Sequence, residues 1–341
     1  MDALYVRATL RPMYLFDVAD SIRGLEDPNE PEAAAPTASH KPRYLGFDPP
    51  PRVIHTSDAR IALFSFGVVG VQYAISFDGT WADLVKVAAA LLDDAAIAAK
   101  AREHARGALQ QADVETTYDN WLAEDYLIVE VAAGAASLQQ NGESIAALVR
   151  GEVQPLAESE VREVLHSALS CYPHDLLVVG WAAAFVSDTP EGAQSTLQLL
   201  EFANAQLLEL RHYGQRVREV LRGLYRIQQE PGRRLWWRRW RTVREVERLN
   251  QIRLEVVDLM ERSDNSLRVL GDMFYARAYR TIAQRIGVDD YRKLVEERVR
   301  TAGEVYHFLV EESNHSRAFV LEAMVVLILV IELAMALTGK R

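Results

Sequence analysis

The sequence predicts an α+β protein with an N-terminal mixed α/β domain, a long antiparallel, coiled-coil-like helical arm and one C-terminal transmembrane helix. Three observations support this prediction. Short apolar segments with strand-like patterning occupy the first half, an apolar heptad pattern starts at Leu200, and an almost wholly apolar segment lies near the end. We place the domain at 1–190, the arm at 191–317 and the transmembrane helix at 318–337.

Composition indicates a folded protein, and it argues against several kinds of binding site. Apolar residues make up 49% of the 341 residues and charged residues 25%, as in chains that form a core. The net charge is −10, yet residues 205–262 hold 14 Arg, no Lys and 8 acidic residues. This distribution favours one local anionic contact over general nucleic-acid binding. Cys171 is the single cysteine, which excludes an internal disulfide and a Cys-based zinc site, and we expect it to be buried.

The N-terminal half contains both strand and helix patterns. Apolar and polar side chains alternate over 4–10, which predicts a strand, and we expect a short helix over 13–23 and an exposed loop over 26–41. Residues 61–76 combine β-branched side chains with two glycines, which favours two paired strands. The other expected elements are a helix at 81–93, a strand at 122–131, helices at 144–149 and 158–169, and a buried strand or core helix at 175–186.

The arm is predicted from a heptad seam, in which apolar residues recur at spacings of three and four. Pro231 and Gly232 end the first helix. A second helical stretch begins near Val243 and ends at Gly287, and a third begins at Asp289 or Asp290. The seam of the first helix consists of Leu200, Ala203, Leu207, Leu210, Gly214, Val217, Leu221 and Leu224.

The turn between the first two arm helices combines tryptophan with arginine. A membrane interface selects this combination, because Trp suits the headgroup layer and Arg meets lipid phosphate. Contact with a partner or RNA, and a solvated turn, are the alternatives. We therefore interpret the turn as a membrane-interface or partner patch formed by Arg233, Arg234, Trp236, Trp237, Arg238, Arg239, Trp240 and Arg241.

The segment 318–337 predicts the membrane anchor. Eighteen of its twenty residues are apolar, the exceptions being Glu322 and Glu332, and twenty helical residues span about 30 Å, the thickness of a bilayer core. The alternative is a buried helix in a soluble oligomer. Carboxylates are costly in hydrocarbon, so they indicate contacts between neighbouring copies and hence a homo-oligomer. Without a signal peptide at the start, we expect a bacterial inner membrane location with the body in the cytoplasm.

No catalytic, cofactor or metal motif supports an enzyme. The sequence has no P-loop, no GxGxxG after a strand, no HExxH and no GxSxG, and its eight histidines have no metal-ligand spacing. We therefore expect no cofactor and no enzyme activity, with the lipid bilayer and further copies of the chain as partners. Nucleic acid is a less favoured partner.

The end of the chain resembles the required-for-meiotic-nuclear-division family, which includes yeast Sad-one-interacting-factor relatives and a mitochondrial inner-membrane member. Residues 311–317, then Leu321-Glu322 and Ile331-Glu332, are similar to the polar stretch and the Leu-Glu and Ile-Glu pairs of that family. Residues 61–70 are similar to its strand pair with phenylalanine and glycine. By position, the residues that match the tail motif are His315, Arg317, Glu322 and Glu332.

The resemblance implies support of membrane-associated processes such as translation or division, and it implies that the tail residues contact other subunits. We accordingly expect a non-enzymatic, homo-oligomeric, membrane-anchored scaffold or tether. One alternative is an enzyme that acts on nucleotides or RNA with its α/β domain. Another is a membrane-remodelling or pore-like assembly of the glutamate-bearing tail helices.

Overall fold

A computed structural model of the chain describes residues 5–18, 50–114, 121–229, 244, 247–259, 261, 273–305, 325, 326 and 329. Contacts group the chain into two units. The first unit comprises residues 1–212 and 257–292, and the second comprises 213–256 and 293–341. The first unit contains the sheet and the second contains helical segments, and each is described by itself.

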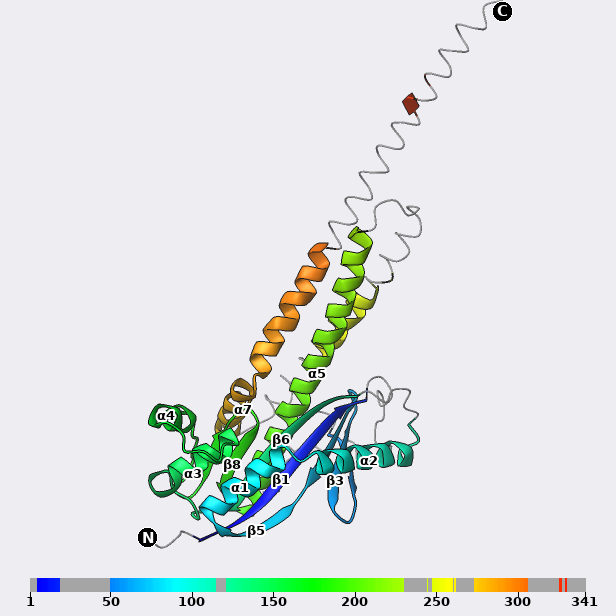
Figure 1. Cartoon of the computed structure of the whole chain (residues 1–341). Coiled ribbons are helices and arrows are strands. Elements are labelled where there is room, and N and C mark those ends of the chain that lie inside the picture. The colour runs from blue at the N-terminus through cyan, green and yellow to red at the C-terminus, as the bar shows by residue number, and fades with distance from the viewer. Residues whose placement is uncertain are drawn as a thin grey trace, which may run out of the picture. The chain divides into compact units, whose positions relative to one another are not determined.

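The described strands of the first unit form one eight-stranded sheet (Figure 1). Its order is β2-β3-β4-β1-β6-β8-β7, and β5 also pairs with β1. The pair β6–β8 is parallel and the other strand pairs are antiparallel. The strands are β1 (Tyr5–Asp17), β2 (Arg52–His55), β3 (Ala59–Phe64), β4 (Val68–Tyr73), β5 (Ile75–Thr80), β6 (Leu122–Ala132), β7 (Leu176–Val179) and β8 (Ala183–Asp188).

Strand β1 is longer than the sequence pattern predicts and organises the sheet. One edge pairs with β5 and then β4, and the other edge pairs with β6 along most of its length. The helix expected over 13–23 is wrong over 13–17, which belong to β1. This end of β1 is apolar on both faces because both faces are covered: Met13 and Leu15 are fully buried, and so are Tyr14 and Phe16 on the other face. A strand buried on both faces loses the alternation that identifies strands in sequences.

The prediction of two paired strands within 61–76 is confirmed by the β3–β4 hairpin. Gly67 lies in the turn with φ of 111°, a conformation that favours glycine. The segment 175–186, for which a strand and a helix were both open, forms the antiparallel pair β7–β8. Both strands are almost wholly buried, so their sequence lacks a polar face that would distinguish strand from helix.

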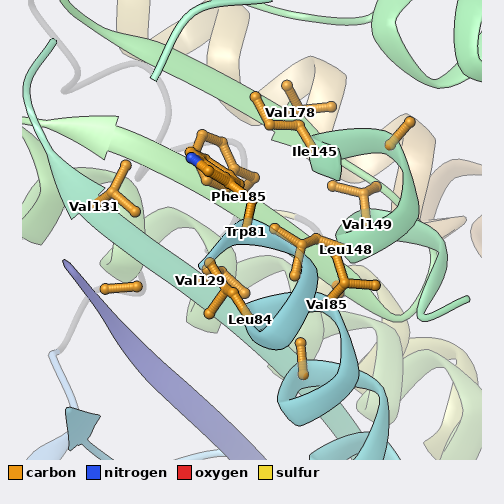
Figure 2. Close-up of a cluster of buried hydrophobic side chains, with 14 of the residues drawn as sticks. Trp81, Leu84, Val85, Val129, Val131, Ile145, Leu148, Val149, Val178 and Phe185 are labelled. Atoms are coloured by element: carbon orange, nitrogen blue, oxygen red, sulfur yellow. The ribbon is translucent and has the colours of Figure 1, made fainter. Parts of the chain in front are cut away.

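One face of the sheet is covered by α1 (Trp81–Leu92), α2 (Ala95–Gln111), α3 (Leu138–Arg150) and α4 (Glu158–His166). The first three helices begin at capping side chains that accept backbone N–H bonds, namely Thr80, Asp94 and Ser137. Figure 2 shows the core between α1, α3 and the strands, where Trp81 and Phe185 lie together. A separate cluster packs α2 onto β1, β3 and β4. The helices expected at 81–93, 144–149 and 158–169 and the strand at 122–131 are thus confirmed, with shifted ends.

The opposite face of the sheet is crossed by the first half of α5 (Pro190–Gln229), a helix of 40 residues. Its Glu201 contacts Arg60 of β3, and its His212 contacts Asp17 of β1. Helix α7 (Met273–Ile286) contacts β7 and α5, and its Tyr279 ring lies 5.2 Å from that of Phe202. The predicted seam is confirmed as a buried stripe, because only Leu221 of its eight residues is partly exposed.

The second unit contains the remainder of α5, residues 244–256 where described, and residues 293–305. Gly214 of α5 lets another helix approach closely, since a Cβ there would lie 3.3 Å from Arg298 and 3.5 Å from Val295. Arg298 also donates to the Gly214 carbonyl, and Arg216 donates to Glu255 at 2.6 Å. The second half of the seam therefore packs against helices of the same chain.

The prediction of a transmembrane helix is contradicted by the structure. Within the described ranges, every helix is too short or too polar to span a bilayer. Of 318–337, the structure describes only Val325, Val326 and Leu329. In physical terms, Glu322 and Glu332 divide the apolar segment, and a carboxylate in hydrocarbon costs about 2.5 kcal/mol or more, which opposes insertion. Two further predictions depended on this helix, namely the single-pass anchor and the location in a bacterial inner membrane. Both are wrong for the same reason.

Candidate functional site: a polar cleft between the sheet and α5

A cleft of about 580 Å³ opens between the polar end of the sheet and the first turns of α5. This volume is in the range of pockets that hold small organic ligands. Strands β1, β3, β4 and β6 supply its floor, and α5 supplies one wall. Its described lining consists of Arg11, Pro50, Pro51, Val53, His55, Arg60, Gln72, Glu130, Pro190, Gln194, Leu197, Gln198 and Glu201.

A charged pair connects the floor to the wall. Arg60 Nη1 donates to both carboxylate oxygens of Glu201, at 2.8 and 2.9 Å. The Glu201 side chain is only 4% exposed, whereas that of Arg60 is 27% exposed. Gly70 makes room for this pair, because a Cβ there would lie 3.3 Å from a Glu201 oxygen. A buried carboxylate needs such a partner to offset its loss of water.

A second charged pair lies within the sheet. Arg11 on β1 donates from Nε to Glu130 on β6 at 2.6 Å, and both side chains are about three-quarters buried. Within the described part of the chain, this is the one bond that the Arg11 guanidinium makes. Glu130 therefore fixes the plane of the Arg11 guanidinium and leaves its two terminal nitrogens available to a ligand. This pair of nitrogens can bind a carboxylate or phosphate through two parallel bonds.

Gln72 on β4 is the third polar group of the floor. The residue is only 8% exposed, and among the described residues no partner bonds to its side-chain amide. Its neighbours on the same face of β4, Val68 and Gly70, alternate with the core residues Val69 and Val71. An amide that faces a cleft without a protein partner is available to bond to a ligand or to water.

The wall formed by α5 adds amides and a helix start. Pro190 is the first residue of the helix, and Gln194, Leu197 and Gln198 follow on the side that lines the cleft. The N-terminus of a long helix carries a partial positive charge that favours an anion. Pro50, Pro51, Val53 and Leu197 give the cleft an apolar surface. The cleft thus combines arginine, amide and apolar groups, which together suit a flat, polar, anionic molecule.

An adjoining hollow of about 800 Å³ shares Glu130 and Pro190 with the cleft. It is lined by more acidic than basic groups, including Asp78 and Asp188. Burial raises the pKa of the Asp188 carboxyl above its ordinary value, while bonds from the Thr189 backbone N–H and hydroxyl oppose the rise. Asp188 lies against the first turn of α5, where Gly192 leaves room for it, and this contact accounts for its position.

A separate cluster on the α2 side of the sheet is structural. Lys100 of α2 bonds to Asp58 before β3, and the Tyr73 hydroxyl lies 3.1 Å from His104 Nδ1. The bond from Lys100 lowers the pKa of the Asp58 carboxyl, whereas burial raises the pKa of Tyr73 to about 12. A neutral, buried phenol is a poor nucleophile, so these contacts serve to fasten α2 to the sheet.

The residues that the sequence singled out lie outside the described part of the chain. This applies to the tail residues His315, Arg317, Glu322 and Glu332 and to the turn residues Arg233, Arg234, Trp236, Trp237, Arg238, Arg239, Trp240 and Arg241. Cys171, which was expected to be buried, is exposed. It sits in a turn organised by Asp175, which accepts bonds from the Cys171 and Tyr172 backbone N–H groups.

The cleft residues were missed because they come from six elements that are spread along the sequence. The available signal was local: Arg7, Thr9 and Arg11 alternate with Val6, Ala8 and Leu10. That alternation identifies one polar face of a strand, but not what lies across from it. Glu201 likewise stands in an apolar stretch of α5 and has no motif around it.

The fold and cleft together define a mixed α/β domain with a ligand-sized polar cleft, continued by a helical arm. The chain belongs to the family described as "Uncharacterized protein MJ0711, N-terminal domain", whose model matches residues 7–194. This range includes the whole floor of the cleft and the start of α5.

A relative from Methanocaldococcus jannaschii, "Uncharacterized protein MJ0711", is 21% identical over 212 residues. That match covers 62% of this chain and 64% of the relative, so the chain spans somewhat less than two thirds of the relative's length. No solved structure matches.

Proposed function

We propose that the chain is a non-enzymatic scaffold whose α/β domain binds a small organic anion in the cleft. The observation that carries this proposal is Arg11, which Glu130 holds through Nε so that both terminal nitrogens remain for a ligand. The amides and apolar side chains of the cleft support it, because they suit the uncharged part of such a molecule. The two glutamates are already bonded to arginines, an arrangement that suits holding a ligand.

The experiment is a calorimetric titration of the full chain with ribose 5-phosphate and with inorganic phosphate. We expect saturable binding that Arg11→Ala weakens by about 10-fold or more, since bonds to charged groups contribute about 1.5–3 kcal/mol. Arg162→Ala is the matched control, because Arg162 is exposed on α4 and, among the described residues, bonds only to the Glu158 carbonyl. Equal weakening by both variants, or no binding by the unaltered chain, would refute the proposal.

Homo-oligomerisation through the helical arm is the second part of the proposed scaffold role. Leu254 in the second unit is 71% exposed, a large apolar group that contact with another copy would cover. Light scattering after size-exclusion chromatography measures the mass directly. We expect a multiple of 38.4 kDa that Leu254→Glu reduces and Arg253→Ala, on the same exposed helix, leaves unchanged. A mass of one chain for the unaltered protein would remove this part of the proposal.

An enzyme that acts on a nucleotide is the second candidate function. It is favoured by His55, which lines the cleft and is a side-chain type that transfers protons near neutral pH. Chromatography of nucleotide mixtures after long incubation distinguishes the two functions. A product that forms with the unaltered chain and not with His55→Gln would establish turnover in place of binding alone.

A further inference from the structure

We infer that the ligand of the cleft is a nucleotide, whose phosphate contacts Arg11 and whose base is bound by the Gln72 amide. This inference rests on the proposed binding function and names the class of ligand. It begins from Gln72, which is more than nine-tenths buried, lines the cleft and has no side-chain partner among the described residues.

A carboxamide offers one acceptor and two donor hydrogens in a plane. A ligand that satisfies it must present a donor and an acceptor side by side. Nucleobase edges have this arrangement, and glutamine is a recognised bidentate partner of adenine. A simple phosphate or carboxylate would satisfy the donors of Gln72 and leave its oxygen without a partner.

The remaining lining fits the other parts of a nucleotide. Pro50, Pro51, Val53 and Leu197 provide apolar surface for the face of a base. Arg11 provides the phosphate contact. Gln72 and Arg11 stand on strands β4 and β1, whose register pairs Gln72 with Met13, so the two side chains are about 8 Å apart at the backbone by strand spacings. This separation suits two ends of a single small molecule.

The position of Gln72 is determined from both sides of the sheet. Val71 and Tyr73, its neighbours along β4, are buried in the core under α2. Opposite it on β3 stands Arg60, which the Glu201 carboxylate holds. A fixed strand determines where the Gln72 amide can reach in the cleft, as a specificity determinant requires.

The test compares ribose 5-phosphate with the four nucleoside 5′-monophosphates by calorimetry on the full chain. We expect at least one nucleotide to bind about 10-fold more tightly than ribose 5-phosphate. Gln72→Leu, which keeps the size of the side chain and removes the amide, should abolish this difference while binding of ribose 5-phosphate is retained. Gln110→Leu, at an exposed position of α2 outside the cleft, is the matched control and should leave the difference unchanged.

Each outcome has a distinct meaning. If ribose 5-phosphate binds and no nucleotide gains affinity over it, the base contact is wrong and the anion-binding function stands. If Gln72→Leu leaves the gain unchanged, the base is held elsewhere and this inference is also overturned. If neither sugar phosphate nor nucleotide binds, the proposed function itself has failed. Circular dichroism of Gln72→Leu shows whether the variant is folded; if it is not, Gln72→Met, which is uncharged, similar in length and lacks the amide, provides the same comparison.

Discussion

Glu201 illustrates how a single side chain connects the sheet to α5. It is buried, and Arg60 supplies its cation from a strand 141 positions away in the sequence. Its removal deprives that mostly buried arginine of the carboxylate to which it donates, which is the costly way to break an ion pair. The pair therefore contributes to the fold as well as to the wall of the cleft.

We predict that Glu201→Ala lowers the free energy of unfolding by about 2 kcal/mol, less than a fully buried pair would cost because Arg60 is partly exposed. Urea denaturation measures the change. Glu163→Ala is the matched control, since Glu163 pairs with Arg285 at 3.1 Å but is 59% exposed, and we expect a loss below about 1 kcal/mol. Equal losses for the two variants would show that burial of Glu201 has no energetic consequence.

The tyrosines beneath α2 predict a pH dependence of stability. Burial raises the pKa of both Tyr14 and Tyr73 to about 12, and the nearby Asp58 carboxylate adds to the shift at Tyr73. Because these values lie above the unfolded value of about 10, folding favours the neutral phenols. Their stabilising contribution is complete below about pH 10 and is lost as the pH rises toward 12.

Denaturation midpoints measured between these pH values test this prediction. Tyr73→Phe should show a shallower decline than the unaltered chain, because the Phe side chain cannot ionise. Tyr225→Phe, at an exposed position of α5, is the control and should decline as steeply as the unaltered chain. Identical slopes for all three proteins would contradict the assigned pKa shifts.

At the scale of elements, Gly287 determines how α7 ends. It has φ of 92°, and a Cβ there would lie 2.9 Å from the Trp181 ring in the β7–β8 connection. The sequence predicted this stop, but not the contact with Trp181. A side chain at this position meets both an unfavourable backbone conformation and a neighbouring ring.

Gly287→Ala should lower the free energy of unfolding by about 1–2 kcal/mol. Gly303→Ala is the opposite case, because a Cβ there meets nothing within 4 Å and the residue is helical, so we expect a gain of up to about 1 kcal/mol. Thermal unfolding of the two variants measures both changes in the free energy of unfolding, the expected loss at Gly287 and the expected gain at Gly303. A gain at Gly287 would mean that the left-handed turn is not retained in solution.

The elements also show which helices and strands can be predicted from the hydrophobic pattern of the sequence. The helices at 81–92 and 158–166 have one buried and one exposed side, and the strand at 122–132 alternates at both ends around the buried residues 126–129, so their periodicity was visible. Residues 13–17, 176–179 and 183–186 are buried on both sides, and apolar runs of this kind do not distinguish strand from helix. The heptad seam was correctly predicted as a buried stripe. Its partners could not be predicted, because heptad spacing does not specify whether a helix packs on its own chain or on another.

At the scale of the whole molecule, the sequence predicted functional residues near the end of the chain, whereas the structure has its candidate site on the sheet. The apolar tail and the Trp-Arg turn are conspicuous because like residues stand together in the sequence. The cleft is assembled from Arg11, Gln72, Glu130 and Glu201, which are separated by dozens of residues and come together only through the order β4-β1-β6 and the course of α5 across it. Sites of this kind require the topology before any residue can be chosen.

The most direct test of the central claim, that the cleft binds an organic anion, follows Arg11 and Gln72 themselves. Two-dimensional ¹H–¹⁵N spectra of the full chain would record the Arg11 Nε–H and Gln72 amide signals, assigned with Arg11→Lys and Gln72→Leu, during addition of the nucleoside monophosphates. If the ligand binds in the cleft, we expect both signals to shift and to saturate together at one affinity. Saturable binding that leaves both signals in place, with shifts confined to other parts of the chain, would contradict it.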